Sequence, residues 1–229
     1  MLALVGSGEY LPGMDTVDQE LLRRLKEPAR VVCLPTAAGT EGDEVITSWS
    51  QKGVAHFTRL GVDVEAVPVV DRTTAQNQAL ADRIASANFV YLSGGKPTYL
   101  HQSLQDTPVW SAILAVHQSG GIVAGCSAGA MIMGAKIMGF PLMNEGFALL
   151  PNSLIVPHFD EFPDILSRVI HLLMGTKVTM LGVDGYTALV AEGHHLEVLG
   201  TGGVTIWNHQ QHQRYSQGLM PNRDALNLV

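Results

Sequence analysis

The sequence predicts an α/β fold in which a mostly parallel sheet has helices on both faces. Segments typical of short apolar strands alternate along the chain with segments of helical periodicity. Hydrophobic residues make up 46% of the 229 residues and charged residues only 15%, which is typical of a sheet that is buried on both sides. Several predicted strands end in glycine-rich turns, and functional groups of parallel sheets collect at such strand ends.

The first half of the chain shows the alternation most clearly. Pro28 stops the first predicted helix, and Pro108 occupies the first position of the last one, where its missing N–H is not needed. The predicted strands cover residues 2–5, 30–34, 62–69, 89–92 and 122–124, and the later helices cover residues 44–60, 73–87 and 108–119.

The second half predicts a change from parallel to antiparallel pairing. Strands are expected at residues 154–156 and 178–183, with a helix over residues 162–174 between them. The last predicted strands are short, follow one another closely and favour antiparallel pairing: residues 188–191, 196–199 and 204–207. No linker, repeat or low-complexity segment interrupts the pattern, so residues 1–229 are predicted to form a single domain.

Charge and composition narrow the classes of function. The chain has 14 basic and 21 acidic residues and a net charge of −7, without a basic stripe, so we expect no nucleic-acid partner. It has no apolar run long enough to span a membrane and no basic leader with a cleavage site. We therefore expect a cytoplasmic protein without a membrane partner, in which Cys33 and Cys126 are reduced.

The strongest chemical motif is Gly-Cys-Ser-Ala-Gly at residues 125–129, which fits the pattern G-x-S-x-G. In such a turn the serine lies between a strand and a helix, with its hydroxyl raised above the sheet edge. Small neighbours are required because bulky ones would collide with the strand or the helix. We therefore predict that Ser127 is a nucleophile, and that N–H groups of the following helix favour a developing anion.

With Ala130, this segment resembles the nucleophile segment of the dipeptidase E and cyanophycinase family of serine peptidases. That family has the class I glutamine amidotransferase-like fold, a flavodoxin-like three-layer arrangement. Other segments resemble the family as well, and together they extend over roughly residues 4–207: residues 91–95, 146–151, 181–184 and 187–190. The resemblance implies hydrolysis of short peptides through an acyl-enzyme, a possible homodimer, and no metal or organic cofactor.

A nucleophilic serine needs a base. His158 follows a predicted strand and Pro157, and it lies where the family has its catalytic histidine. The family carries an orienting glutamate after the late strand, but the matching position here is Gly185. We therefore predict that Asp184, one residue earlier, orients the base. Two other carboxylates remain as alternatives: Asp160 and Glu145.

The remaining predicted site residues concern the oxyanion hole and the substrate. The amide of Ala128 follows the nucleophile, and Gly95 is predicted to supply the second donor. Gly94 is predicted to bind substrate in the same loop, and Glu9 and Tyr10 to line the cleft. Arg168 is the only cation shortly after His158, and residues 159–164 are acidic and apolar, which leaves room for a neutral or basic substrate. We therefore assign Arg168 to substrate binding.

Two other classes of function fit part of the pattern. An α/β-hydrolase esterase would use the order Ser127, Asp184, His209, but the sequence lacks an HGGG-type oxyanion loop. A non-catalytic, amidotransferase-like binding protein would explain Gly185. Glutamine hydrolysis is disfavoured because the central residue of the turn is a serine, and Cys126 is one position early.

Overall fold

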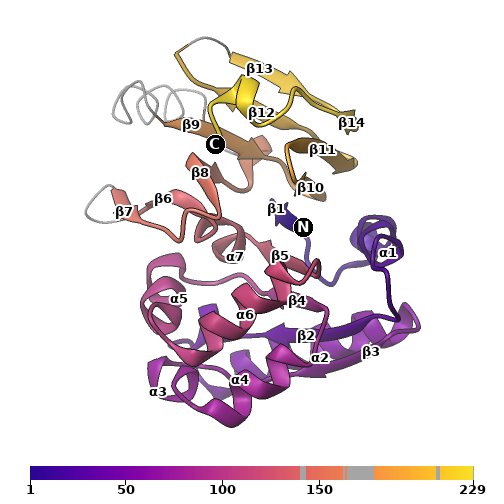
Figure 1. Cartoon of the computed structure of the whole chain (residues 1–229), viewed down its shortest axis with the longest axis vertical. Helices are drawn as coiled ribbons and strands as arrows, with labels where there is room; N and C mark the ends of the chain where they lie inside the picture. The colour runs from indigo at the N-terminus through magenta and orange to yellow at the C-terminus, as the bar shows by residue number, and fades with distance from the viewer. Residues whose placement is uncertain (140–142, 162, 164–177, 210–211, 229) are drawn as a thin grey trace.

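The computed structural model describes residues 1–139, 143–161, 163, 178–209 and 212–228. Its centre is a sheet that combines parallel and antiparallel strands (Figure 1). In order across this main sheet, the strands are β14 (Gly218–Leu219), β11 (His195–Gly200), β10 (Thr187–Glu192), β1 (Leu2–Val5), β5 (Ile122–Cys126), β4 (Phe89–Leu92), β2 (Arg30–Leu34) and β3 (Asp63–Ala66).

The main sheet has a parallel half and an antiparallel half. Strands β1, β5, β4, β2 and β3 pair in parallel, whereas β10, β11 and β14 pair antiparallel from the other side of β1. The predicted α/β fold, with short antiparallel strands near the end of the chain, is therefore confirmed.

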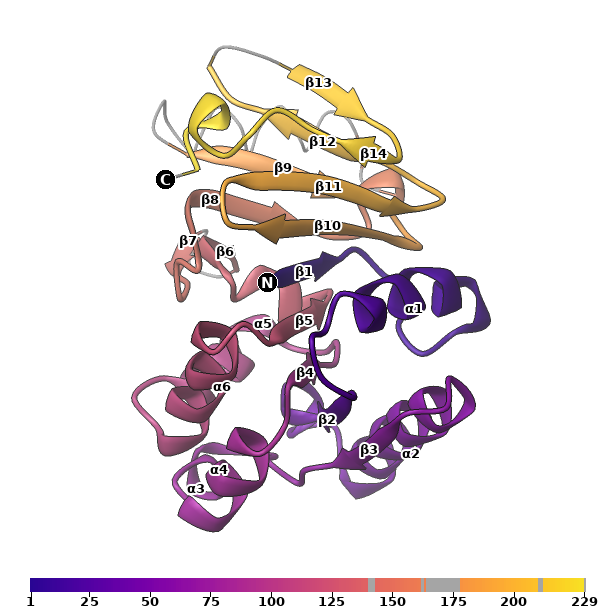
Figure 2. The same cartoon turned by 45° about the vertical axis from the view of Figure 1, so that its right-hand side comes forward.

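Successive residues of a strand point to opposite faces of the sheet. Because strands β1, β5 and β4 of the parallel half carry buried apolar residues on both faces, both faces are covered by helices. Ala3 and Val5 pack with α1 (Asp15–Arg23) and α2 (Asp43–Arg59), whereas Leu4 belongs to the core on the other face. The two views agree on this arrangement of helices (Figures 1 and 2). The helices of the other face are α4 (Gln78–Ala85), α5 (Pro97–Leu104) and α6 (Pro108–Gln118), with the short α3 (Arg72–Ala75) beside them.

A second sheet packs against the antiparallel half (Figure 2). Leu189 and Val198 of the main sheet share one buried cluster with Leu181 and Val204 of the second sheet. The strands of the second sheet are β13 (His212–Tyr215), β12 (Val204–Trp207), β9 (Thr179–Val183), β8 (Leu150–Val156), β6 (Gly134–Met138) and β7 (Met143–Glu145). This packing brings the end of β8 to the end of β5.

Local structure differs from the prediction in the segment from residue 73 to residue 87. Instead of one helix, α3 ends before Asn77, whose side chain caps α4 by accepting a hydrogen bond from the Ala79 amide. Asp71, rather than Thr73, caps α3 through a reciprocal capping box with Thr74. Two polar caps therefore divide one apolar periodicity into two helices.

The helix predicted over residues 162–174, with Arg168, lies outside the described residues except for residue 163. None of the described helices is both long enough and apolar enough to cross a bilayer.

Candidate active site

Ser127 lies in the turn between β5 and α7 (Ala128–Met131). Its backbone angles are φ 50° and ψ −110°, a conformation that is unusual for a residue with a side chain. The turn is held from the sheet side, because the Ser127 amide donates to the Val5 carbonyl at 3.0 Å. A strained residue that neighbouring structure fixes in this way is typical of a functional position.

The small residues around Ser127 are required by close backbone contacts. A Cβ atom on Gly125 would lie 2.4 Å from the carbonyl carbon of Gly129. A Cβ atom on Gly129 would lie 2.4 Å from the carbonyl oxygen of Leu92. The two glycines of the G-x-S-x-G pattern therefore allow strand β5, helix α7 and strand β4 to approach one another.

His158 reaches Ser127 from the second sheet. It follows β8 and Pro157, and its Nε2 atom lies 3.3 Å from Ser127 Oγ. His158 also has a positive φ, 52°, and its carbonyl accepts a hydrogen bond from the Glu161 amide in the 3-10 turn Phe159–Glu161. The structure thus brings together the nucleophile and the base that the sequence predicts.

The sequence predicts that the helix after Ser127 favours an anion at its N-terminus, but α7 is too short to have a large dipole. It has only four residues, so few aligned peptide units contribute. A helix dipole therefore adds little here, and the Ala128 amide remains a candidate donor through its position next to Ser127.

The loop that contains Gly94 and Gly95 lies beside the Ser127 turn. A Cβ atom on Gly94 would lie 3.4 Å from Ser127 Cβ, and one on Gly95 would lie 2.5 Å from the Ala37 carbonyl oxygen. Gly95 has φ +143°, which favours glycine. The Gly94 amide donates to Glu9 at 3.0 Å, so Gly95, rather than Gly94, is the candidate for an amide that faces an oxyanion.

Asp184 is buried at the end of β9, but its carboxylate is engaged elsewhere. Oδ2 accepts a hydrogen bond from the Gly203 amide at 2.9 Å and forms an ion pair with Arg214. Oδ1 is buried and has no hydrogen-bond partner within the described part of the chain. Among the described residues, Asp184 makes no hydrogen bond with His158, so the structure does not bring this predicted residue into direct contact with the base.

The two alternative carboxylates have different surroundings. Asp160 lies in the 3-10 turn after His158, and its Oδ1 accepts from the Gly185 amide at 2.7 Å. A Cβ atom on Gly185 would lie 3.4 Å from Asp160 Oδ2. Asp160 therefore occupies space that a side chain at position 185 would enter. Glu145 is exposed on β7 and pairs with Lys136, away from this group of residues.

Within the described residues, neither Tyr10 nor His209 makes a hydrogen bond with Ser127. Tyr10 is buried, and its hydroxyl lies 3.0 Å from Ser93 Oγ, so it belongs to the core rather than to a cleft wall. His209 is exposed and makes no hydrogen bond with Ser127 in the described structure, which gives the esterase order no support. Arg168 falls in the part of the chain that is not described.

Glu9 makes two links at the site that the sequence does not indicate. Besides its bond from Gly94, the Glu9 carboxylate accepts a hydrogen bond from the Cys126 thiol at 2.9 Å. Glu9 is separated from these partners by more than 80 residues, and no local pattern signals such a contact. Burial, together with the Glu9 carboxylate, raises the pKa of the Cys126 thiol well above its ordinary value, which favours the protonated donor.

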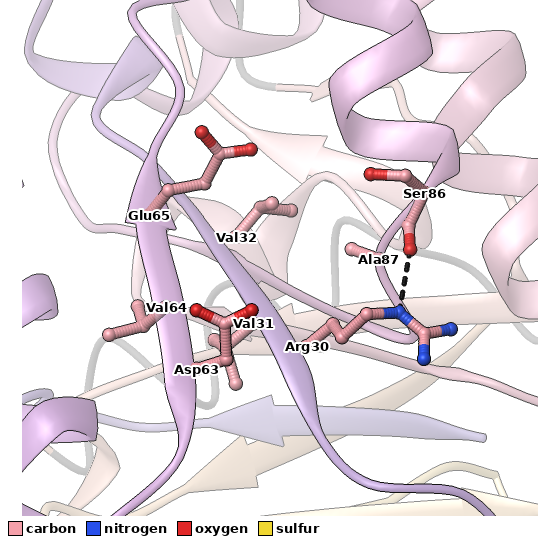
Figure 3. A pocket seen from close by; sticks show the side chains of 8 residues that line it. All are labelled: Arg30, Val31, Val32, Asp63, Val64, Glu65, Ser86 and Ala87. Atoms are coloured by element: carbon pink, nitrogen blue, oxygen red, sulfur yellow. Dashed lines mark hydrogen bonds between the residues drawn. The ribbon is translucent and has the colours of Figure 1, made fainter.

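No three His, Cys, Asp or Glu side chains in the described ranges are grouped so as to hold a metal ion. A hollow lies at the amino ends of β2 and β3 (Figure 3), whereas Ser127 follows the carboxyl end of β5. Its Arg30 donates to the Ser86 carbonyl at 2.9 Å, and its Glu65 pairs with Arg83, so these polar groups already have partners.

The fold and the Ser127–His158 pair define the class as an α/β protein with the arrangement of a hydrolytic enzyme. Comparison with known families then gives a specific assignment: the chain belongs to Peptidase family S51, whose model matches residues 2–199. The resemblance to dipeptidase E and cyanophycinase is therefore confirmed at the level of the family.

Individual relatives agree with this assignment. The solved structure of a peptidase from an acI-B1 actinobacterium is 35% identical, with a TM-score of 0.88 and 96% of each chain covered. A putative peptidase E protein from Listeria monocytogenes is 20% identical, with a TM-score of 0.64 over 88% of this chain and 98% of that one, and shows the shared fold.

The similarity to cyanophycinases is more distant. The cyanophycinase of Synechococcus elongatus is 28% identical over 165 residues, which cover 66% of this chain and 51% of that protein. The chain therefore spans about half the length of this curated relative.

Proposed function

We propose that this protein is a serine peptidase of the dipeptidase E type, which hydrolyses short peptides through an acyl-enzyme on Ser127. The observation that carries the proposal is the 3.3 Å contact between His158 Nε2 and Ser127 Oγ at a strained turn. Membership of Peptidase family S51 supports the choice of a peptide bond as the target. The Ser127 turn is then a nucleophile elbow.

Acylation begins when Ser127 Oγ attacks the carbonyl carbon of the peptide bond, while His158 Nε2 takes the hydroxyl proton. The carbonyl oxygen becomes an oxyanion, for which the Ala128 and Gly95 amides are the proposed donors. When the tetrahedral intermediate collapses, the C–N bond breaks and His158 gives its proton to the leaving amine. The product of this half-reaction is an ester of Ser127.

Deacylation repeats these steps with water as the nucleophile. His158 takes a proton from the water, whose oxygen attacks the ester carbon. Collapse of the second intermediate breaks the bond to Ser127 Oγ, and His158 returns the proton to that oxygen. The free serine and a peptide carboxylate remain.

Two aspartates are candidates for the carboxylate that orients His158 in this proposal. Asp184 was expected from its sequence position, but its hydrogen bond with Gly203 and its ion pair with Arg214 hold it. Asp160 is two residues from the base and exposed, and its Oδ1 bonds Gly185, the position of the family's glutamate. We favour Asp160, because rotation of an exposed side chain is less restricted than rotation of a buried, ion-paired one.

Peptide-library mass spectrometry tests the proposal directly. The wild-type protein and the Ser127→Ala variant would be incubated with a defined mixture of di- to hexapeptides, with Ser111→Ala on α6 as a matched serine control. Cleavage by the wild type and the control, but not by Ser127→Ala, is expected. Equal cleavage by all three proteins would show that the activity does not belong to Ser127.

A non-catalytic binding protein is the second candidate. One observation favours it: in the described structure, the His158 imidazole has no hydrogen-bond partner besides Ser127 Oγ, so no carboxylate orients the ring. A well-folded wild-type protein that binds peptides of the library without cleaving any of them would favour this function.

A further inference from the structure

Glu9 joins the two loops that flank Ser127. It lies beyond the carboxyl end of β1, and its two carboxylate oxygens have different partners. Oε1 accepts from the Gly94 amide at 3.0 Å, and Oε2 accepts from the Cys126 thiol at 2.9 Å. One half-buried side chain therefore links the glycine loop after β4 to the residue just before the nucleophile.

The packing around this carboxylate is tight. A Cβ atom on Gly94 would lie 2.7 Å from Glu9 Oε1 and 3.4 Å from Ser127 Cβ. The carboxylate, the Gly94 backbone and the Ser127 side chain thus meet around one point. A change in the position of Glu9 would move the glycine loop relative to Ser127.

The glycine loop is anchored on both sides of Gly95. On one side the Gly94 amide is held by Glu9, and on the other the Lys96 amide donates to the Ala37 carbonyl at 2.9 Å. Gly95 itself adopts φ +143°, with the Ala37 oxygen 2.5 Å from where its Cβ would lie. These two anchors restrict the direction in which the Gly95 amide points.

We propose that Glu9 is a positioning residue, which holds the glycine loop against the Ser127 turn so that the Gly95 and Ala128 amides converge on the oxyanion. This inference rests on the proposed function. The role depends on the lone pairs of Glu9 as acceptors and does not depend on its negative charge, since a charge beside the site would oppose a developing oxyanion.

Two variants of similar size separate the acceptor from the charge. Glu9→Gln keeps an oxygen that can accept from the Gly94 amide, whereas Glu9→Leu fills the same space without an acceptor. Glu192→Ala, an exposed change at the end of β10, is the control. The probe is a fluorophosphonate. The measured quantity is the second-order rate constant for labelling of Ser127, compared only among variants whose thermal transitions match that of the wild type.

The expected result is that Glu9→Leu labels about 100-fold more slowly than the wild type, which is typical of the loss of one oxyanion donor. Glu9→Gln is expected to remain within about threefold of the wild type, because its carbonyl oxygen still accepts from the Gly94 amide, while its NH2 group meets the sulfur of Cys126, a weak acceptor. The control keeps Glu9 itself and is expected to remain in the same range. If Glu9→Leu does not fold, Glu9→Ala replaces it with the same expectation.

Two results would overturn the inference: labelling of the Leu and Ala variants at the wild-type rate, or labelling of Glu9→Gln as slow as that of Glu9→Leu. Failure of the proposed function would differ, since the wild-type protein itself would not be labelled at Ser127. The differences in labelling rate between the variants and the wild type therefore test the role of Glu9. Labelling of the wild-type protein at Ser127 tests the proposed peptidase function.

Discussion

His158 Nε2 lies 3.3 Å from Ser127 Oγ, although the two residues follow strands of different sheets. Ser127 follows β5 of the main sheet, and His158 follows β8 of the second sheet. Both residues have a positive φ, 50° and 52°, so each side chain is aimed by a turn rather than by regular structure. The alignment of the pair therefore depends on how the two sheets pack.

Single and double substitutions at this pair should have non-additive effects. Ser127→Ala and His158→Ala are each expected to lower kcat for peptide hydrolysis by at least about 10³-fold, since the two groups act as a unit. The double variant should be no slower than the slower single variant. Steady-state assays with a peptide from the library measure this, and fully multiplicative losses would show that the residues act independently.

Asp160 should have a positioning role, and Asp184 should have a structural role. Asp160→Asn is expected to lower kcat by at least about tenfold, with about 10⁴-fold as the upper end when the orienting carboxylate is lost. Asp184→Asn should leave kcat within about tenfold but lower the free energy of unfolding by about 1–3 kcal/mol, because it weakens the hydrogen bond and the ion pair of a buried carboxylate whose partner, Arg214, is exposed. Kinetics and urea unfolding of both variants provide the measurements; the opposite pattern would assign the orienting role to Asp184.

The glycine before the nucleophile should not tolerate a methyl group. Gly125→Ala places Cβ 2.4 Å from the backbone of Gly129, and we expect the free energy of unfolding to fall by about 3 kcal/mol or more. Gly61→Ala is a matched control, because its Cβ would meet no atom within 4 Å and only its positive φ, 81°, is unfavourable. Its expected cost is about 1 kcal/mol. Equal costs in urea unfolding would contradict the steric explanation.

Both cysteines should resist alkylation in the native protein. Burial raises the pKa of the Cys33 thiol to about 12, and burial with the Glu9 carboxylate raises the pKa of Cys126 well above its ordinary value. A raised thiol pKa leaves less reactive thiolate at any given pH, so labelling should be slow at pH 8 and increase as the pH rises. At pH 8, iodoacetamide labelling followed by mass spectrometry should modify both residues rapidly only after denaturation. Rapid labelling of Cys126 in folded protein would contradict its contact with Glu9.

The sequence could predict the parts of the fold that depend on local pattern. The strand before Ser127, the small residues around it, and His158 after a strand and Pro157 are all visible as short motifs. The covering helices follow from periodicity and from caps such as Thr107, whose hydroxyl accepts from the Trp110 amide. The resemblance to a known family gave meaning to the order in which these motifs occur along the chain.

The remainder depends on contacts between distant segments. An apolar strand such as β8 does not reveal its partners, so its place in a second sheet could not be predicted from its composition. Strand β6 was missed because its glycine and lysine weaken the apolar pattern. The orientation of Asp184 depends on Arg214, which lies 30 residues later on β13, and nothing near Asp184 in the sequence indicates that partner.

Intact-protein mass spectrometry after exposure to a fluorophosphonate tests the central claim most directly. Wild-type protein, Ser127→Ala and His158→Ala would be compared, each shown to be folded by its thermal transition. A single adduct on the wild type that is absent from both variants is the predicted result, since it requires an activated serine with His158 as its base. A folded wild-type protein without an adduct, or an adduct that persists in Ser127→Ala, would contradict the account.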